Sequence, residues 1–395
     1  MRMRIILTFG AFLILICSAA GQIHRDGLAL RQSRTDKSLL KCQEIRNPFC
    51  HPTDTINVVF TGDMMMHSAQ IINARNAENQ FDFSECFSKT RHLIQEADIA
   101  VANMEFTLAG EPYTGYPCFS APDSFAEATA ECGVDVFLTA NNHILDKGRK
   151  GAERTLGIYS DMEKDKGIRH AGSAVSPEDD SLRFPLKILA KGIRLALINF
   201  TYGTNIRIRE AFPKVHLADT AEIAAAIRRA KDTGADFIIA LPHWGNEYAL
   251  RHSERQGKLA RWLADNGCDA VIGTHPHVIQ DIETLTVHRK DGSGECKVPV
   301  IYSLGNFISN MSAPNTQVGM IATLGFTKDW LGDCDMLEPR LTLIWCSRPG
   351  HLARGYTTIP IKEYVGKRGL WINQWDYHKM ITSYERVKKE TGIID

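Results

Sequence analysis

The sequence predicts an α/β protein in which helices pack on a sheet. Four segments repeat one plan: a helix-like stretch, a short turn, an apolar run rich in strand-forming residues, and a group of polar side chains. This alternation is typical of α/β architecture. The 395 residues are 44% hydrophobic, which excludes wholesale disorder. Their acidic and basic side chains balance, so the chain has no basic field for nucleic acid.

The N-terminal residues have the layout of a cleaved secretory signal. Arginines and an apolar run fill residues 2–17, and small residues follow at 18–21. The run is shorter than the about 20 residues that a spanning helix needs. We therefore expect residues 1–21 to be a signal peptide, with an uncleaved anchor or a lipidated Cys17 as alternatives. Residues 22–54 read as a polar linker or arm. The expected location is the periplasm, the outside of the cell or the outer face of the membrane.

The main domain is expected at residues 55–361. Its first apolar run, 56–60, ends in Thr61-Gly62-Asp63, which is typical of a buried strand that enters a turn. The repeated strands each begin just after an aspartate, at Asp98, Asp135, Asp236 and Asp269. Helix-like stretches precede them at 88–96, 124–132, 220–231 and 253–266.

The later part of the chain carries further strand signals and a helix. Apolar runs predict strands at 298–302, 321–326, 340–346 and 356–361. Residues 378–389 have a helical pattern, with Lys388 and Lys389 near the end where the helix dipole favours cations. We assign residues 362–395 to a C-terminal helical extension.

Polar side chains collect where the predicted strands end. Ligands of α/β proteins bind beyond the carboxyl ends of the strands, because the loops converge there. Carboxylates and imidazoles together suit Mn, Fe, Zn or Co better than an all-oxygen calcium site. One bridging carboxylate with several histidines can hold two ions about 3.5–4 Å apart and activate a water. The candidates are Asp63, His67, Asn103, Glu105, Asn142, His143, His243, His275 and His277.

Six motifs occur in order over about residues 55–310. They are Gly62-Asp63, Asn103-Met-Glu105, Asn141-Asn142-His143-x-x-Asp146-x-Gly148, His243-Trp244-Gly245-x-Glu247-Tyr248, Gly273-x-His275-Pro276-His277-Val278 and Tyr302-Ser303-Leu304-Gly305-Asn306-Phe307. Together they resemble the CapA family of capsule-synthesis proteins, associated with poly-γ-glutamate, a branch of the calcineurin-like metallophosphoesterases. The resemblance implies an αββα β-sandwich: two mixed sheets flanked by helices, with a dimetal site at one edge.

The resemblance also implies a role for individual residues. The implied metal ligands are Asp63 and His277 for one ion, Asn142, His243 and His275 for the other, and Glu105 as the bridge. His143 matches the catalytic histidine of the superfamily. Independently of the resemblance, Asp146 could orient His143 or cap the following turn. On the substrate side we expect His67, Asn103, Glu247, Tyr248 and Asn306.

Two positions depart from the superfamily's pattern. Met64 and Met65 follow Asp63 where the superfamily has Asp-x-His, and His67 is the nearest histidine. Asn103-Met-Glu105 stands where the superfamily has Gly-Asp-x-x-Asp. One ion therefore lacks a usual histidine ligand and the bridge is a longer carboxylate. The expected cofactor is one or two divalent ions, Mn, Fe or Zn.

The resemblance implies a role in poly-γ-glutamate or capsule-type polymer biosynthesis or processing. The residues themselves favour a metal-dependent hydrolase, and the N-terminal layout favours export. A metal-activated water would attack a phosphate ester or an amide carbonyl. The expected partners are an anionic polymer or phosphoester substrate and a membrane-bound polymer-synthesis complex, without nucleic acid. One alternative is a non-catalytic polymer-binding scaffold on the same fold, which the missing Asp-x-His favours. Another is an exported phosphodiesterase or nucleotidase.

Overall fold

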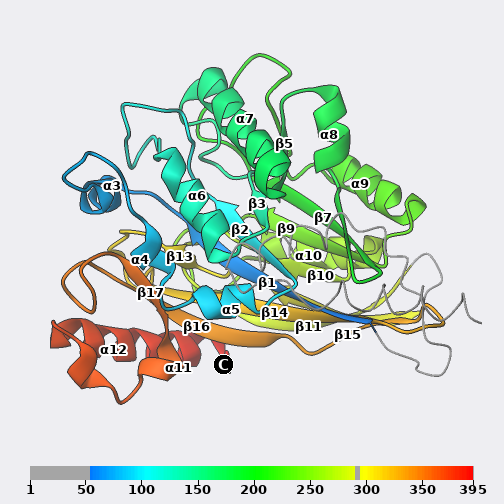
Figure 1. The fold of residues 1–395 in the computed structure, drawn as a ribbon. Coiled ribbons are helices and arrows are strands. Elements are labelled where there is room, and N and C mark those ends of the chain that lie inside the picture. Colours follow the sequence, from blue (N-terminus) through cyan, green and yellow to red (C-terminus); the bar gives the residue numbers. More distant parts are fainter. Residues whose placement is uncertain (1–53, 290–293, 395) are drawn as a thin grey trace, which may run out of the picture. The chain divides into compact units, whose positions relative to one another are not determined.

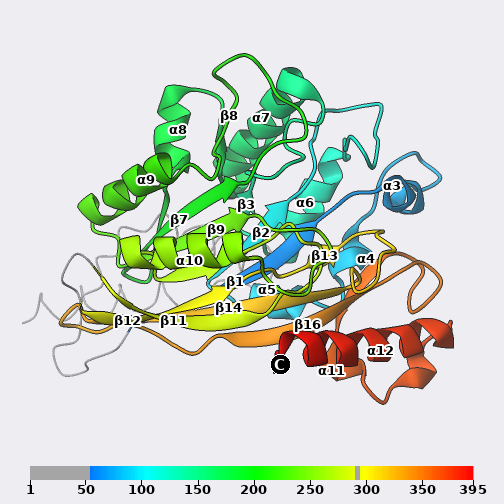
Figure 2. The same ribbon diagram turned by 180° about the vertical axis from the view of Figure 1, so that it is seen from behind.

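Two mixed β-sheets face each other across a shared apolar core in the computed structural model, which describes residues 54–289 and 294–394. Figure 1 and Figure 2 show the sheets between two groups of helices. The predicted signal peptide and almost all of the predicted arm lie outside the described residues. Within the described ranges, the helices are too short or too polar for any of them to cross a membrane.

The larger sheet has the strand order β17-β16-β14-β1-β2-β3-β4, with β13 paired to β1 and β15 to β14. Strands β1 to β4 run parallel, whereas β14 is antiparallel to β1. The bounds are β1 (Asp54–Met64), β2 (Ile99–Met104), β3 (Val136–Leu138), β4 (Arg169–Ala171), β13 (Asn306–Ile308), β14 (Val318–Lys328), β15 (Cys334–Met336), β16 (Arg340–Ser347) and β17 (Thr357–Pro360).

The smaller sheet has the order β11-β12-β10-β9-β7-β6 and is also mixed. Its central strands β7, β9, β10 and β12 are parallel, and β6 and β11 are antiparallel at the edges. The bounds are β6 (Leu186–Ala190), β7 (Ile193–Thr201), β9 (Phe237–His243), β10 (Ala270–Ile272), β11 (Ile282–His288) and β12 (Glu295–Ile301). A separate pair joins β5 (Ser173–Ala174) and β8 (Lys214–Val215).

Alternate residues of each strand face different layers, as the two-residue period of a strand requires. Val58 of β1 and Ile239 of β9 share the core between the sheets. Val59, the next residue of β1, lies in a second core with the helices of the larger sheet. Ala240, the next residue of β9, lies in a third core with α9 and α10. The αββα arrangement expected from the sequence is therefore confirmed.

The helices cover the outer faces of the two sheets. Those next to the larger sheet are α3 (Ser68–Ala74), α4 (Ser84–Phe87), α5 (Arg91–Gln95), α6 (Asp123–Cys132) and α7 (Gly148–Lys166). The segment predicted as one helix over 88–96 is shorter, because α4 ends just before it and α5 begins at Arg91. Near the smaller sheet lie α8 (Pro177–Arg183), α9 (Thr220–Asp232) and α10 (Glu254–Asn266).

The C-terminal segment is helical and packs on the larger sheet. It contains α11 (Ile361–Tyr364), a 3-10 turn (Arg368–Leu370) and α12 (Gln374–Thr391). Met380 and Val387 of α12 belong to the same core as the inner faces of the sheets. This helix contacts β14 and β16, so it extends the main core at that end of the larger sheet.

Candidate metal centre

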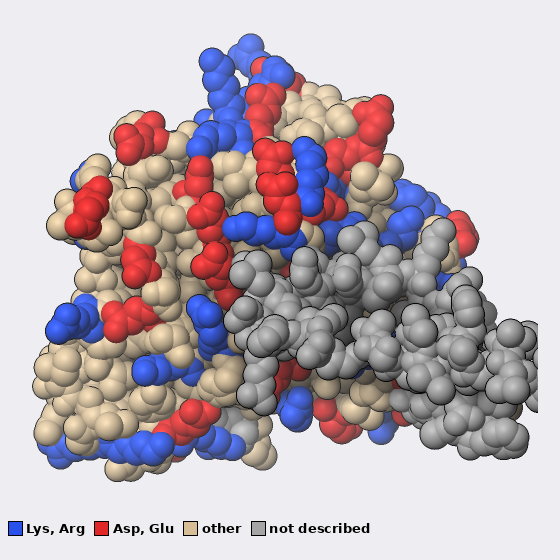
Figure 3. All heavy atoms as spheres, viewed as in Figure 1, with Lys and Arg blue, Asp and Glu red and all other residues tan. Residues whose placement is uncertain are grey.

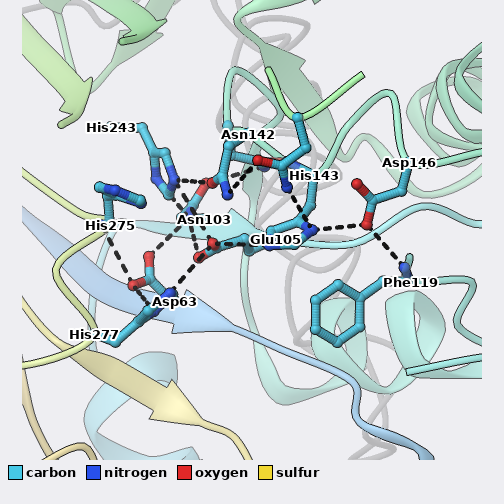
Figure 4. Close-up of polar contacts among 12 residues, drawn as sticks. Asp63, Asn103, Glu105, Phe119, Asn142, His143, Asp146, His243, His275 and His277 are labelled. Atoms are coloured by element: carbon cyan, nitrogen blue, oxygen red, sulfur yellow. Dashed lines mark hydrogen bonds and ion pairs between the residues drawn. The ribbon is translucent and has the colours of Figure 1, made fainter. Parts of the chain in front are cut away.

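The ends of five strands bring the predicted site residues together, as Figure 4 shows. Asp63, Asn103 and His243 lie at the ends of β1, β2 and β9, and the others follow β2, β3 and β10. The carboxyl ends of neighbouring parallel strands meet at one edge, so residues far apart in sequence converge. All of these side chains are buried, with at most 4% exposed: Asp63, Asn103, Glu105, Asn142, His143, Asp146, His243, His275 and His277.

Glu105 lies at the centre of the cluster. Its Oε1 atom is 3.7 Å from His243 Nε2, 3.7 Å from His277 Nε2 and 4.0 Å from His143 Nε2. Among the described residues, this buried oxygen has no hydrogen-bond partner. A buried carboxylate oxygen without a donor is costly, and a bound cation is one partner that would satisfy it.

Two overlapping sets of side chains could each hold an ion. One set is Asp63, Glu105 and His243, and the other is Glu105, His275 and His277; within each set the ligand atoms lie within 4.8 Å of one another. Glu105 belongs to both sets, which is the position of a bridge. The sequence resemblance instead pairs Asp63 with His277, and Asp63 Oδ2 does lie 3.2 Å from His277 Nδ1. The division of the ligands between two ions stays a prediction.

Asn142 joins this cluster through His243. Its Oδ1 lies 2.7 Å from His243 Nε2, the nitrogen that also faces Glu105. The Asn142 amide nitrogen donates to Asn205 Oδ1 at 3.4 Å, so the carbonyl oxygen is left to face the centre. An amide oxygen and an imidazole nitrogen are suitable ligands for Mn, Fe or Zn.

The electrostatics of the cluster favour a bound cation. Burial, followed by the nearby charge of Asp63, raises the pKa of Glu105 well above its usual value. Burial lowers the pKa of His243 well below its usual value and that of His275 to about 3. The two imidazoles are thus neutral and can each offer a lone pair, while a divalent cation would stabilise both carboxylates in the charged form.

Side-chain amide and hydroxyl groups contact the candidate metal ligands at hydrogen-bond distance. Asn103 Nδ2 donates to Asp63 Oδ1 at 2.8 Å and lies 3.4 Å from Glu105 Oε2. Asn306 Oδ1 lies 3.1 Å from His277 Nδ1, and Thr274 Oγ1 lies 2.9 Å from His243 Nδ1. Partners of this kind fix the orientation of metal ligands. The substrate contacts expected of Asn103 and Asn306 stay a prediction.

His143 lies beside the cluster. Its imidazole is held through Nδ1, the ring nitrogen that does not face Glu105. Its Nδ1 lies 2.7 Å from Asp146 Oδ2, which also accepts the Phe119 backbone N–H at 2.8 Å. The Phe119 ring packs edge-on against the imidazole, with 4.7 Å between the centroids. An Nδ1–H donated to Asp146 would leave Nε2 directed at the centre. The orienting role of Asp146 stays a prediction.

The remaining predicted residues lie at the rim. His67 is partly buried, and burial lowers its pKa to about 4, but it belongs to neither ligand set among the described residues. Glu247 is exposed, and Tyr248 is 46% exposed with its ring 6.5 Å from that of His277. Their predicted substrate contacts remain open to test.

Two residues that the sequence reasoning missed also reach the centre. The Tyr202 ring lies 4.5 Å from that of His275, and its backbone N–H donates to His243 O at 2.9 Å. Asn205 Nδ2 lies 3.3 Å from His143 Nδ1. Both residues follow β7, whose end carries a polar pair, Asn199 and Thr201. Polar residues at the end of a strand are the signal that could have identified Tyr202 and Asn205 from the sequence.

The fold and this centre define a class: an α/β sandwich protein with a buried carboxylate–histidine site of the kind that holds divalent ions. The chain belongs to the family described as Bacterial capsule synthesis protein PGA_cap, which matches residues 57–311. The family resemblance inferred from the six motifs is thereby confirmed.

Two curated relatives carry capsule names. The "PGA biosynthesis protein CapA" of Bacillus subtilis (strain 168) is 25% identical over 292 residues, covering 71% of this chain and 70% of the relative. The "Capsule biosynthesis protein CapA" of Bacillus anthracis is 26% identical over 280 residues, covering 67% of this chain and 62% of the relative. This chain thus spans under two thirds of the second relative's length.

Similar solved structures include phosphoesterases. The NAD nucleotidase of Haemophilus influenzae aligns with a TM-score of 0.46 and 14% identity, covering 86% of this chain and 68% of that one. The calcineurin-like phosphoesterase YfkN from Bacillus subtilis aligns with a TM-score of 0.41 and 13% identity, covering 87% of this chain and 100% of that one.

Proposed function

We propose that this chain is an exported, metal-dependent hydrolase that acts on a capsule-type anionic polymer, poly-γ-glutamate, during its biosynthesis or processing. Membership of the capsule-synthesis family supports the pathway. The arginine-flanked apolar run at residues 2–17 supports export to the periplasm, the cell surface or the medium.

The observation that carries the enzymatic part is the environment of Glu105 Oε1. This buried oxygen lacks a hydrogen-bond donor among the residues that the structure describes, and three imidazole Nε2 atoms lie within 4.0 Å of it. Oxygen and nitrogen donors in this combination fit Mn, Fe or Zn. The residues that would hold the ions are Asp63, Glu105, Asn142, His243, His275 and His277.

A divalent ion bound there supplies Lewis acidity to a phosphoryl or carbonyl oxygen and lowers the pKa of water to about 7. The protein's own contribution comes from His143, whose Nε2 faces the centre while Asp146 holds Nδ1. A histidine in this position can give a proton to the leaving group or stabilise a developing oxyanion. Tyr202, whose ring centroid lies 4.5 Å from that of His275, borders this side of the centre.

A substrate panel on metal-replete protein tests the proposal. We expect release of free amines or shortened chains from poly-γ-glutamate, with bis-(p-nitrophenyl) phosphate and nucleotides as phosphoester comparisons. If the protein turns over only the phosphoesters, the result would instead support a phosphodiesterase or nucleotidase. Loss of activity after chelation, and recovery with Mn, Fe or Zn, is the expected metal dependence.

A second function, a non-catalytic polymer-binding scaffold, is favoured by one observation. Met64 and Met65 occupy the positions after Asp63 and pack into a core, and His67 lies in neither ligand set of the described chain. One side of the centre is therefore short of a histidine. A protein that binds a single ion and polymer, and turns over no member of the panel, would support the scaffold.

A further inference from the structure

Three cationic side chains bind one loop at the edge of the metal centre. The loop, residues 310–317, follows β13, and the cations come from β16 and α12 or directly follow them. Each donates to a carbonyl or amide oxygen of the loop. The pairs are Arg348 Nη2 to Asn310 O (3.2 Å) and Met311 O (2.9 Å), Arg386 Nε to Asn315 Oδ1 (2.8 Å), and Lys379 Nζ to Gln317 Oε1.

These cations lack carboxylate partners. Across the described ranges, neither Arg348 nor Lys379 nor Arg386 forms an ion pair, and Arg348 Nε is buried without an acceptor. Some exposed cations elsewhere do pair, as Lys164 does with Asp161 at 2.9 Å and Lys258 with Glu254 at 2.6 Å. Neutral oxygens orient the three cations without forming an ion pair with them.

One acid near this group, Asp376, forms its hydrogen bonds with other side chains through Oδ2. Asp376 is 1% exposed, and its Oδ2 accepts Ser347 Oγ–H at 2.8 Å and Trp345 Nε1–H at 3.1 Å. Its Oδ1 lies 3.1 Å from His351 Nδ1. Burial and then the charge of Arg348 lower the pKa of Lys379, and Asp376 opposes them.

The loop connects this group to the candidate metal ligands. Asn310 donates its backbone N–H to His67 Nδ1 at 3.3 Å. Asn306 donates to Thr316 O at 3.0 Å, and its Oδ1 lies 3.1 Å from His277 Nδ1. The cations therefore lie along one side of the loop whose other contacts reach the metal centre.

We propose that Arg348, Lys379 and Arg386 form a docking track for the carboxylates of an anionic polymer that runs from α12 toward the metal centre. The inference rests on the proposed function for the identity of the polymer. Lys379 and Arg386 are seven residues apart, two turns along one face of α12, so about 10 Å of chain could be held along the helix. Arg386 is exposed, and Lys379 is partly exposed.

An aromatic side chain completes the track. Trp375 is 60% exposed, and Lys379 Nζ lies 5.5 Å from the centroid of its ring. An exposed indole beside a cation suits a chain that alternates carboxylates with methylene groups, because the ring can cover the apolar links.

The charge distribution favours a carboxylate polymer over nucleic acid. Figure 3 shows Lys and Arg along the left part of the lower edge, where Figure 1 places α12, with acidic side chains beside them. A duplex carries one charge per about 1.7 Å and is bound by broad basic surfaces. A short track on a chain of zero net charge fits a flexible polyanion that contacts a few cations at a time.

Binding of labelled poly-γ-glutamate to metal-stripped protein at low salt tests the track. The K379Q/R386Q variant should bind about tenfold more weakly, with a smaller salt dependence. The K379R/R386K variant keeps the charges and should bind like the unchanged protein. The K164Q/K258Q variant removes two paired cations elsewhere and is the matched control for net charge. Thermal melting checks that each variant is folded.

The outcomes separate this inference from the proposed function. Equal binding by K379Q/R386Q and the unchanged protein would overturn the track, even if the protein hydrolyses the polymer. Weaker binding by K379Q/R386Q, without turnover of any substrate, would support the track and count against the hydrolase. Tighter binding of duplex DNA or polyphosphate than of poly-γ-glutamate would overturn the choice of a carboxylate polymer.

Discussion

His275 and His277 hold backbone conformations that L-residues rarely adopt, with φ of 99° and 59°. Such conformations cost about 1–3 kcal/mol each and persist where the surrounding structure over-determines them. Both side chains are buried beside Glu105. The strained backbone places two imidazoles in one short loop at the site, so we interpret it as serving metal binding.

Substitution of His275 with glycine should separate metal binding from folding. Glycine adopts positive φ freely, so relief of strain offsets part of the lost packing, and we expect the apoprotein to keep its stability within about 1 kcal/mol. The stabilisation by Mn, Fe or Zn, about 2.7 kcal/mol at a hundredfold excess over Kd, should be largely lost. Thermal melting with and without metal measures both, and an unchanged metal-induced shift would exclude His275 as a ligand.

Substitution of His143 with glutamine should remove turnover while metal content stays unchanged. The imidazole faces Glu105 at 4.0 Å and is held by Asp146, so it is placed to handle a proton beside the ions. General acid–base catalysis contributes about 10²–10⁴-fold in rate. Asp146→Asn should lower kcat less and leave KM nearly unchanged. Retained turnover in His143→Gln would remove this residue from the mechanism.

At the scale of elements, the aspartate that directly precedes each repeated strand helps to set the register between that strand and its neighbour. Asp135 accepts the Ala100 N–H at 2.8 Å, and Asp269 accepts the Ile238 N–H at 2.7 Å. Asp98 and Asp236 bond in the same way to Asn57 and Arg194. A carboxylate at the start of one strand thus satisfies a backbone donor of its neighbour. Register in turn decides which residues reach the carboxyl ends, where the metal centre lies.

Two glycines, Gly62 and Gly305, allow the backbones of two strands to approach each other closely beside the candidate metal centre. A Cβ atom at Gly62 would lie 1.9 Å from Gly305 O, and Asp63 N–H donates to that same oxygen at 2.9 Å. The Gly-Asp and Gly-Asn motifs of the sequence are therefore a contact pair between β1 and the start of β13. We expect Gly62→Ala to lower the free energy of unfolding by about 3 kcal/mol, because backbone must move.

The matched control for this variant is Gly157→Ala. Gly157 lies within α7, and a Cβ atom there meets nothing within 4 Å. Alanine at such a helical site stabilises by about 0.5–1 kcal/mol. Chemical denaturation of both variants measures the difference. A Gly62→Ala protein as stable as the unchanged chain would show that the two strands do not approach this closely.

The sequence predicted about half of the strands and helices, because apolar runs and helical spacing are local signals. It did not predict the strands β6 and β7 or the long helix α7. It also predicted that the site residues meet, since parallel strands share one carboxyl edge. It could not predict that Asn103 would bond to Asp63 and lie beside Glu105, because that depends on the register between β1 and β2. Tyr202 and Asn205 were missed because they look like ordinary loop residues until the β7 loop is placed.

At the scale of the whole molecule, a buried carboxylate ties α12 to the larger sheet. Asp376 accepts hydrogen bonds from Ser347 at 2.8 Å, from Trp345 at 3.1 Å and from Trp371 at 3.3 Å. Asp376→Ala would leave these donors buried and unsatisfied, so we expect a loss of about 3 kcal/mol in the free energy of unfolding. Glu385→Ala, an exposed acid on the same helix, should have little effect in the same denaturation experiment.

The arrangement of the molecule joins three features at one edge: the candidate metal centre, the loop 310–317 and the cations that bind it. Two sheets supply the ligands, and the C-terminal helix supplies two of the cations. The proposed polymer track and the proposed hydrolytic centre are therefore neighbours through a single loop. Both depend on the claim that the buried cluster around Glu105 holds divalent ions.

Elemental analysis of metal per chain tests that claim most directly, on purified protein after repletion with Mn, Fe or Zn. We predict one or two tightly bound ions in the unchanged protein and a clear loss in Glu105→Gln, which removes the shared carboxylate at nearly constant shape. Glu247→Gln, the same substitution at an exposed position, should keep the full content. An unchanged protein that retains no ion, or a Glu105→Gln variant that retains all of them, would contradict the account.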